Sequence, residues 1–270
     1  MIMNEPLNYI EINRALWDAK TKHHVTSAFY NMDNDGFING ATSLNEIELG
    51  LLGNVSGKTI LHLQCHFGQD TLSLSRLGAK ATGVDFSGGA IAKAQELNTK
   101  LGLDAEFICT DIYDLPNKLD QQFDIVYTSY GTIGWLPDMQ RWAQVVAKFL
   151  KPGGKFVFVE FHPVVWMFNY DFTGLEYSYF NKEAIIETAT TTYADRKAEI
   201  NMQEIGWNHD LGEVLQALLD AGLQIDIFKE YDHSPYNCFR NMIEDEPKRF
   251  RIKGLEGKLP LLYSLVATKE

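Results

Sequence analysis

A short loop between an expected strand and an expected helix concentrates side chains that can do chemistry. The stretch TILHLQCHFG, Thr59 to Gly68, runs from an apolar strand through Gln64, Cys65 and His66 to a single glycine. Loops of this kind lie at the carboxyl edge of parallel sheets, where nucleosides and phosphates bind. Phosphate-binding loops usually contain several glycines, because the phosphate approaches backbone amides closely. The single glycine therefore indicates a ligand that approaches the backbone of this loop closely at only one residue.

A carboxylate follows at the end of the next expected strand. Asp85 comes seventeen residues after Gly68, and a carboxylate there can accept hydrogen bonds from both hydroxyls of a ribose. The alternative is that Asp85 caps the following helix. A dinucleotide would require the motif G-x-G-x-x-G, which the loop lacks. S-adenosylmethionine has no phosphate, so these residues favour it over NAD.

The elements that position these residues form an α/β pattern. From about residue 57, short apolar runs alternate with helix-length segments, which is typical of a parallel sheet covered by helices. Seven strands are expected, at residues 58–63, 80–86, 105–111, 123–129, 155–161, 224–232 and 261–269. Helices are expected at residues 8–20, 43–53, 69–78, 89–102, 139–154 and 210–223. We therefore expect an N-terminal helical cap, residues 1–56, before a single sheet domain, residues 57–270.

Two irregular stretches, at about residues 163–207 and 232–258, interrupt the alternation. Long structureless loops are uncommon in compact domains, so both insertions should have structure of their own. The stretch WMFNYDFTGLEYSYF, Trp166 to Phe180, carries an aromatic residue at nearly every second position. We expect Trp166 and Tyr236 to line a largely apolar pocket for a small molecule. The alternative is an aromatic mini-core or a dimer contact, the latter in a homodimer.

Composition argues against several classes of protein. Of the 270 residues, 45% are hydrophobic and 22% charged, as in ordinary globular proteins. The net charge of −12 opposes a nucleic-acid partner. No apolar stretch approaches the ~18 residues of a membrane span, and no secretory leader is evident. The three cysteines are far apart in the sequence, which fits free thiols in a reducing compartment. We expect a cytoplasmic protein without membrane or metal partners, since DNDG at residues 33–36 lacks the later glutamate of a calcium loop.

Five segments together resemble a class I S-adenosylmethionine-dependent methyltransferase. They are, in that family's order and spacing, ILHLQCHFG, GVDFS, CTDIYDLP, FDIVYTSYG and LKPGGKFVFVE. The resemblance covers about residues 57–160 and, more weakly, the last helix and two strands. It implies a seven-stranded, mostly parallel, doubly wound Rossmann-like sheet with an antiparallel last strand. The implied product of the cofactor is S-adenosylhomocysteine.

The resemblance also implies roles for residues that follow the first four strands. Asp85 matches the acidic residue that binds the ribose, Asp111 the one near the adenine, and Tyr130 lines the reactive end. The implied cofactor-binding positions are Gly68, Asp85, Phe86, Asp111, Ile112, Ser129 and Tyr130.

The first motif departs from the family pattern. The family usually has an acidic residue where this chain has His62, and glycines where it has Gln64 and His66. The usual contact to the amino group of the cofactor is therefore in question, and Gln64 or His66 is the candidate to replace it.

Methyl transfer from a sulfonium requires in-line alignment and exclusion of water. Tyr130 and Trp135 are placed to offer aromatic faces to the sulfonium, and His162 is the best-placed base. Core packing of the two aromatics, and a structural role for His162 before Pro163, are the alternatives.

The N-terminal segment around Trp17, His24 and Tyr30 either folds over the methionine end of the cofactor or packs on a helix face. Tyr30 is accordingly a candidate cofactor contact. The function expected is methylation of a small molecule. A non-catalytic S-adenosylmethionine sensor is the alternative. A nucleic-acid methyltransferase is a further one, although SYGT, residues 129–132, replaces the Asn-Pro-Pro-aromatic motif.

Overall fold

The computed structural model describes residues 8–32 and 36–270. Most of the DNDG segment considered as a calcium loop, residues 33–35, lies outside the described residues. No helix in the described part of the chain is both long enough and apolar enough to span a bilayer.

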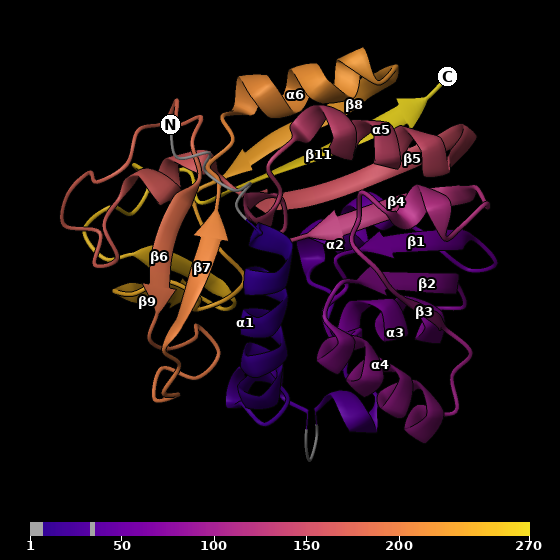
Figure 1. The fold of residues 1–270 in the computed structure, drawn as a ribbon, viewed down its shortest axis with the longest axis horizontal. Helices are drawn as coiled ribbons and strands as arrows, with labels where there is room; N and C mark the ends of the chain where they lie inside the picture. Colours follow the sequence, from indigo (N-terminus) through magenta and orange to yellow (C-terminus); the bar gives the residue numbers. More distant parts are fainter. Residues whose placement is uncertain (1–7, 33–35) are drawn as a thin grey trace, which may run out of the picture.

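A seven-stranded sheet forms the body of the molecule, with strand order β3-β2-β1-β4-β5-β11-β8 (Figure 1). Neighbouring strands from β3 to β5 run parallel, and β11 runs antiparallel to both β5 and β8. The predicted mostly parallel sheet with an antiparallel last strand is confirmed. The strands are β1 Thr59–Leu63, β2 Lys80–Asp85, β3 Glu106–Cys109, β4 Phe123–Ser129, β5 Leu150–Phe161, β8 Leu223–Tyr231 and β11 Leu262–Lys269.

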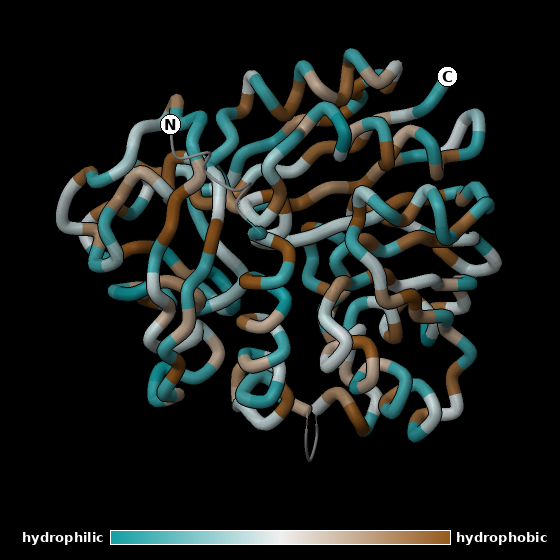
Figure 2. Tube along the Cα trace, viewed as in Figure 1, coloured by the Kyte–Doolittle hydropathy of each residue, from teal (hydrophilic) through white to brown (hydrophobic). Residues whose placement is uncertain are grey.

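Helices cover both faces of the sheet. Because strand side chains alternate between faces, Leu61 packs in the cluster with α5 and α6, whereas Ile60 packs in the opposite cluster with α2 and α3. Figure 2 shows hydrophobic residues concentrated along the strands, with hydrophilic residues on the outer turns of the helices. The helices are α2 Glu46–Leu52, α3 Gln69–Arg76, α4 Gly88–Leu101, α5 Met139–Phe149 and α6 Leu211–Asp220.

The predicted boundary between α5 and β5 is wrong by several residues. The helix was expected to reach residue 154, but it ends at Phe149, and Leu150 is already extended (φ −83°, ψ 135°). Pro152 has no N–H to donate to the helix and disfavours helical backbone at Lys151. The pairing of β4 with β5 shifts register between Phe123 and Ile125, so the Pro-Gly-Gly turn forms an irregularity inside the strand.

A separate layer lies across the carboxyl edge of the sheet. In Figure 1, α1 (Tyr9–His24) stands between the β6–β7 hairpin and helices α3 and α4. Both insertions have structure of their own, as predicted. The remaining elements are the hairpins β6 Ile185–Ala189 with β7 Met202–Gly206 and β9 Met242–Glu246 with β10 Arg249–Ile252, and the 3-10 turns η1 Ala28–Tyr30, η2 Phe37–Asn39, η3 Leu115–Asn117, η4 Ile133–Trp135 and η5 Pro163–Met167.

One side chain attaches α1 to the hairpin as a neighbouring strand would. The Asn13 amide donates to the Ile205 carbonyl at 2.7 Å, and its oxygen accepts from the Ile205 N–H at 3.0 Å. Lys20 adds an ion pair with Glu204 at 3.0 Å. The free edge of β7 is therefore covered by α1.

Candidate functional site

The loop after β1 passes through three residues in left-handed conformation: Gln64 (φ 55°), His66 (φ 51°) and Gly68 (φ 79°). This conformation costs a non-glycine residue roughly 1–2 kcal/mol. At Gly68 a Cβ would also meet the Phe107 ring at 2.7 Å and the Ala94 Cβ at 2.9 Å, so only glycine fits. The chain thus keeps two strained side chains at positions suited to glycine. Strain of this kind is typical of functional sites.

Gln64 presents a buried hydrogen-bond acceptor that nothing satisfies. Its amide Nε2 donates to the Thr132 carbonyl at 2.8 Å, which fixes the orientation of the amide. Its Oε1 is buried and has no hydrogen-bond partner among the described residues. Such an atom is costly unless a donor reaches it, so the position suits an amino group of a ligand.

Asp85, at the end of β2, accepts from the His66 N–H at 2.8 Å and from the Ser87 N–H at 2.9 Å. Its burial raises the pKa of the carboxyl to about 6. The residue that caps α4 is Ser87, whose hydroxyl accepts from the Ala90 N–H, so the alternative that Asp85 is the helix cap is wrong. Each carboxylate oxygen keeps a lone pair for a further donor.

Helix α1 lies across the end of β2. The Asp18 carboxylate accepts from the Gly89 N–H at 3.0 Å, and Arg14 donates to the carbonyl of Phe86 at 3.2 Å. Phe86, a predicted cofactor contact, is thus joined to α1 through its backbone.

Two histidines join α1 to the loop. His24 Nδ1 lies 2.8 Å from His66 Nε2, and His24 Nε2 lies 2.6 Å from the Thr192 hydroxyl. Burial lowers the pKa of His24 to about 2 and that of His66 to about 3, so both are neutral at pH 7. Trp17 packs edge-on against His66 with 5.3 Å between centroids, and Tyr30 stacks on His24 at 5.3 Å. The N-terminal segment thus contacts the loop after β1, and its role as a cover over the methionine end of the cofactor stays a prediction.

Asp111 follows β3 and accepts from the Tyr113 N–H at 2.8 Å, while burial raises the pKa of its carboxyl. Ile112 is buried in the core cluster under α5. Tyr9, at the start of α1, is near enough that burial first and then the charge of Asp111 raise its phenol pKa to about 12. Its ring packs edge-on against Trp207 at 5.3 Å. Tyr9 and Trp207 are therefore additions to the predicted adenine side.

The loop after β4 carries Tyr130 in left-handed conformation (φ 47°). Its hydroxyl donates to Glu48 Oε2 at 2.6 Å, and its ring meets Tyr236 edge-on at 5.1 Å. Ser129 donates to Asp70 at 3.4 Å. The structure therefore brings Ser129, Tyr130 and Tyr236 together beside two carboxylates.

Glu160, at the end of β5, fixes the loop that follows β4. Its buried carboxylate accepts from the backbone N–H of Thr132 at 2.7 Å, Ile133 at 3.2 Å and Phe161 at 2.6 Å. Trp135 in the same loop donates to the Gly131 carbonyl at 2.9 Å. Glu160 had no predicted role, although it closes the motif LKPGGKFVFVE.

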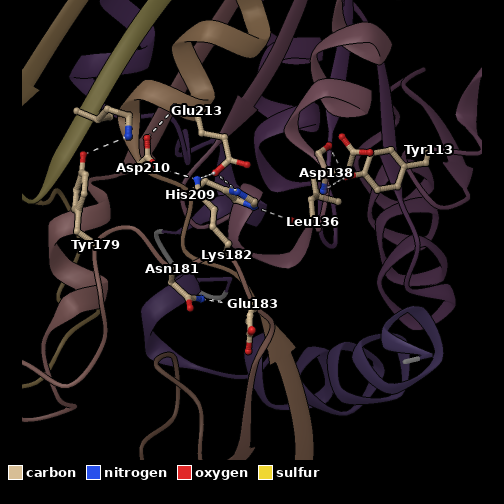
Figure 3. Close-up of polar contacts among 11 residues, drawn as sticks. Tyr113, Leu136, Asp138, Tyr179, Asn181, Lys182, Glu183, His209, Asp210 and Glu213 are labelled. Carbon is tan, nitrogen blue, oxygen red and sulfur yellow. Dashed lines mark hydrogen bonds and ion pairs between the residues drawn. The ribbon is translucent and has the colours of Figure 1, made fainter. Parts of the chain in front are cut away.

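A polar cluster fastens the far end of this loop to α6 (Figure 3). His209 Nε2 lies 2.7 Å from the Leu136 carbonyl and its Nδ1 lies 3.3 Å from Glu213. Lys182 pairs with Glu213 at 3.1 Å, and both His209 and Lys182 help to lower the pKa of Glu213 to about 2. Tyr113 donates to the Asp138 carbonyl at 2.8 Å. The position of Trp135 is thus set from both ends of its loop.

His162 caps η5: its Nδ1 accepts from the Val164 N–H at 3.2 Å. Its Nε2 lies 2.9 Å from the Glu230 carboxylate on β8, and its ring packs edge-on against Tyr263. None of these contacts involves Tyr130 or the loop after β1. The structural alternative thus has direct contacts, and a base role for His162 stays a prediction.

The two insertions contact each other through aromatic rings. Trp166 packs edge-on against Phe161 at 5.8 Å and against Phe239 at 5.6 Å, two partly buried rings that pack on the cluster under η5 and β10, while Trp166 itself is 39% exposed. Trp166 therefore borders an aromatic mini-core with its own ring open to solvent, and its place in an acceptor pocket stays a prediction. Tyr236 packs against Tyr130, whose ring also lies 6.2 Å from that of Phe161, so a chain of rings connects the two predicted pocket residues.

Sequence reasoning missed Glu48 and Asp70. Glu48 was detectable only as the third residue of a capping box that begins at Asn45. Asp70, in the first turn of α3, reads as an ordinary acidic helix start. Neither local pattern indicates that the folded chain places Glu48 and Asp70 near the carboxyl edge of the sheet.

Comparison with known proteins agrees with this architecture. Residues 60–154 match the family described as a methyltransferase domain. A ubiquinone biosynthesis O-methyltransferase of Idiomarina loihiensis is 29% identical over 130 residues, which are 47% of this chain and 53% of that protein. The enzyme of that name from Pseudomonas syringae pv. tomato is 27% identical over 205 residues, 75% of this chain and 80% of that protein. The Idiomarina and Coxiella burnetii relatives are matched over about half their length.

Solved structures share the fold over nearly the whole chain. An S-adenosylmethionine-dependent methyltransferase from Mesorhizobium loti aligns with a TM-score of 0.55 at 21% identity, covering 86% of this chain and 100% of that one. Magnesium protoporphyrin IX methyltransferase from Synechocystis, solved with bound S-adenosylmethionine, aligns with a TM-score of 0.55 at 13% identity, covering 99% and 100%. The seven-stranded sheet is therefore the fold of these proteins.

Proposed function

Since residues 60–154 belong to the class I S-adenosylmethionine-dependent methyltransferase domains, we propose that this protein methylates a small molecule with S-adenosylmethionine. When bound, the cofactor supplies a methyl group already activated by its sulfonium. The task of the protein is then to align the acceptor and to exclude water.

The observation that carries this proposal is the pairing of an unsatisfied acceptor with a carboxylate at one strand edge. Gln64 Oε1 is buried without a partner, and Asp85 stands at the end of the adjacent strand. We assign Gln64 to the amino group of the cofactor and Asp85 to its ribose hydroxyls. His66 contributes through its backbone, whose N–H orients Asp85. Gly68 provides the close approach.

The other end of the nucleoside is assigned to the tips of β3 and β4. Asp111 and the backbone of Ile112 are proposed to hold the adenine, with Tyr9 of α1 above them. Ser129 and Tyr130 are proposed to line the methyl end, and Tyr236 to contact the acceptor. Trp135 and Tyr30 are proposed to close the site.

Helix α1 is proposed to be the cover that keeps the reaction dry. Trp17 lies edge-on to both His66 and Trp135 at 5.3 Å, so one ring joins the loops after β1 and β4. Lys20 is placed 5.2 Å from the ring centroids of Trp17 and Trp135.

The acceptor is proposed to be a small molecule, in line with the names of the curated relatives, because the net charge of −12 disfavours a nucleic-acid acceptor. We also propose a cytoplasmic location, since Cys65, Cys109 and Cys238 are all free thiols.

Calorimetry with S-adenosylmethionine, S-adenosylhomocysteine and NAD tests the cofactor. The first two should bind and NAD should not, because the loop offers no phosphate cradle; tight NAD binding would contradict the proposal. A screen of metabolite extracts with methyl-labelled cofactor then tests the activity. A labelled product is expected, whereas cofactor binding without transfer to any acceptor would identify a sensor.

A further inference from the structure

Two carboxylates, Glu48 on α2 and Asp70 in the first turn of α3, lie close together near the carboxyl edge of the sheet. Glu48 is fully buried, and its Oε2 accepts from Tyr130 at 2.6 Å. Asp70 Oδ1 accepts from the Ser43 hydroxyl at 2.6 Å, and the charge of Asp70 acts on Glu48. Both are held by hydroxyl and amide donors, and both pKa values are raised by burial.

Neither carboxylate has a cationic partner. No lysine, arginine or histidine nitrogen within residues 8–32 and 36–270 lies within 4.0 Å of Glu48 or Asp70. A buried carboxylate is expensive unless a positive charge compensates it, and two adjacent ones are more so. The pair therefore has a strong electrostatic preference for a cation.

The hydroxyl of Tyr127 is a third polar group beside this pair of carboxylates. The Tyr127 hydroxyl is fully buried and has no hydrogen bond of normal geometry to any described residue. It lies beside Asp70: burial and then the charge of Asp70 raise the pKa of the Tyr127 phenol, and Tyr127 in turn acts against the rise in the pKa of Asp70. The buried hydroxyl is thus directed at the same place as the Asp70 carboxylate, and its oxygen can accept a hydrogen bond from a ligand there.

Aromatic rings complete the surroundings. The Tyr236 ring meets Tyr130 edge-on at 5.1 Å and Phe29 at 5.5 Å, and its hydroxyl accepts from the Asn45 amide at 2.6 Å. Asp70, Tyr130 and Tyr236 all keep some accessible surface, whereas Glu48 and Tyr127 are fully enclosed. Carboxylates among aromatic faces are the surroundings that bind organic ammonium groups.

We infer that Asp70 binds the protonated amino group of the methyl acceptor, with the enclosed Glu48 and Tyr127 behind it adding negative potential, so that the acceptor is an alkylamine. This inference rests on the proposed function, and it narrows the acceptor from any small molecule to a cationic one. An ammonium nitrogen must lose a proton before it can accept a methyl group. Asp70, the accessible carboxylate, takes that proton: one N–H bond breaks and one O–H bond forms.

The cofactor itself carries an ammonium and a sulfonium, so the test must separate two sources of positive charge. Probe binding to protein saturated with S-adenosylhomocysteine does so, because the ammonium of the cofactor is already in place. The probes are phenethylamine and its neutral counterpart 2-phenylethanol, measured by calorimetry at pH 7.

Phenethylamine should bind at least about tenfold more tightly than 2-phenylethanol, as expected for a charge-assisted contact. Glu48→Gln and Asp70→Asn should each remove most of that preference, while the affinity for S-adenosylhomocysteine stays within about twofold. Glu46→Gln, on the exposed face of the same helix α2, is the matched control and should keep the preference. If Glu48→Gln fails to fold by circular dichroism, Asp70→Asn carries the comparison.

Three results would overturn the inference. One is equal binding of amine and alcohol, or no binding of the amine. A second is loss of S-adenosylhomocysteine affinity in both variants with the amine preference retained, which would assign the pair to the cofactor. A third is no binding of S-adenosylhomocysteine to the wild-type protein, which would refute the proposed function as well.

Discussion

At the carboxyl edge of the sheet, the buried polar groups next to α1 and those next to α2 differ in charge. On the α1 side, burial lowers the pKa values of His24 and His66, so these groups are neutral at pH 7. On the α2 side, burial raises the pKa values of Glu48 and Asp70, but carboxylates start from a charged form at pH 7. One side is thus suited to a neutral nucleoside and the other to a cation.

The largest expected effect concerns Asp85, the carboxylate on the neutral side. Asp85→Ala should weaken S-adenosylmethionine binding by more than about 1.5 kcal/mol, because hydrogen bonds to a charged group are lost. Calorimetry measures the affinity, and circular dichroism checks the fold. Asp104→Ala, which removes an exposed carboxylate before β3, should change nothing. Equal affinities for the two variants would show that Asp85 only orders the loop.

The neutrality of the α1 side can be tested by pH. The His24 pKa is about 2 in the folded protein, below its ordinary value of about 6.5. The unfolded chain therefore binds a proton that the folded chain does not, and the contribution of His24 to stability is lost as pH falls below about 6.5. The expected slope is about 1.4 kcal/mol per pH unit between about pH 5.5 and 3.

Urea unfolding across that pH range measures this slope. His24→Phe, which cannot titrate, should reduce the slope of the wild-type protein by roughly one proton. Phe29→Leu, a nearby change without a titratable group, should leave it unaltered. An unchanged slope in His24→Phe would mean that His24 is protonated in the folded protein.

Substitutions of Gln64 in the strained loop should have a smaller effect. They should change the stability of the protein and its affinity for the cofactor independently of each other. Gln64→Gly should be more stable than Gln64→Ala by about 1 kcal/mol, because both lack the amide but only glycine relieves the left-handed backbone. Both variants should bind S-adenosylmethionine more weakly than wild type, since the unpaired acceptor is gone. Equal stability of the two would show that the φ of 55° at residue 64 carries no strain.

The smallest expected effect is at the adenine. Asp111→Ala should weaken cofactor binding by less than Asp85→Ala, roughly 0.5–1 kcal/mol, because apolar contacts also hold the base. Calorimetry on the two variants in one buffer gives the ranking. A larger loss at Asp111 would reverse the assignment of the two carboxylates.

Local signals were sufficient for the sheet. Each strand is a short apolar run bounded by turn residues, and the family motifs fix the strand order, so Gly68, Asp85 and Asp111 could be placed from the sequence. The α5–β5 boundary was misplaced because strand pairing with β4 competes with helix formation before Pro152. The alternative that Asp85 caps α4 is excluded because Ser87 fills that role.

Long-range contacts explain what the sequence could not predict. Tyr9, Glu48 and Trp207 reach the strand edge only because distant segments pack together, and no periodicity within their own helices or loops signals it. The segment around Trp166 was expected to line a pocket from its aromatic density. Density does not say whether rings face one another or a ligand, and here Trp166 faces Phe161 and Phe239.

The pairing of Asn13 with Ile205 joins residues separated by 192 positions. On a ribosome, α1 is made first, yet its partner strand appears only when most of the chain has been synthesised, so α1 docks late. The contacts of α1 with Phe86 and Gly89 involve residues made earlier, so the late event is the attachment of α1 to β7. A nascent chain that has not yet made β7 also lacks β8 and β11, so the sheet and its cover are completed together, and a ligand that binds only after α1 docks would favour the completed fold by mass action.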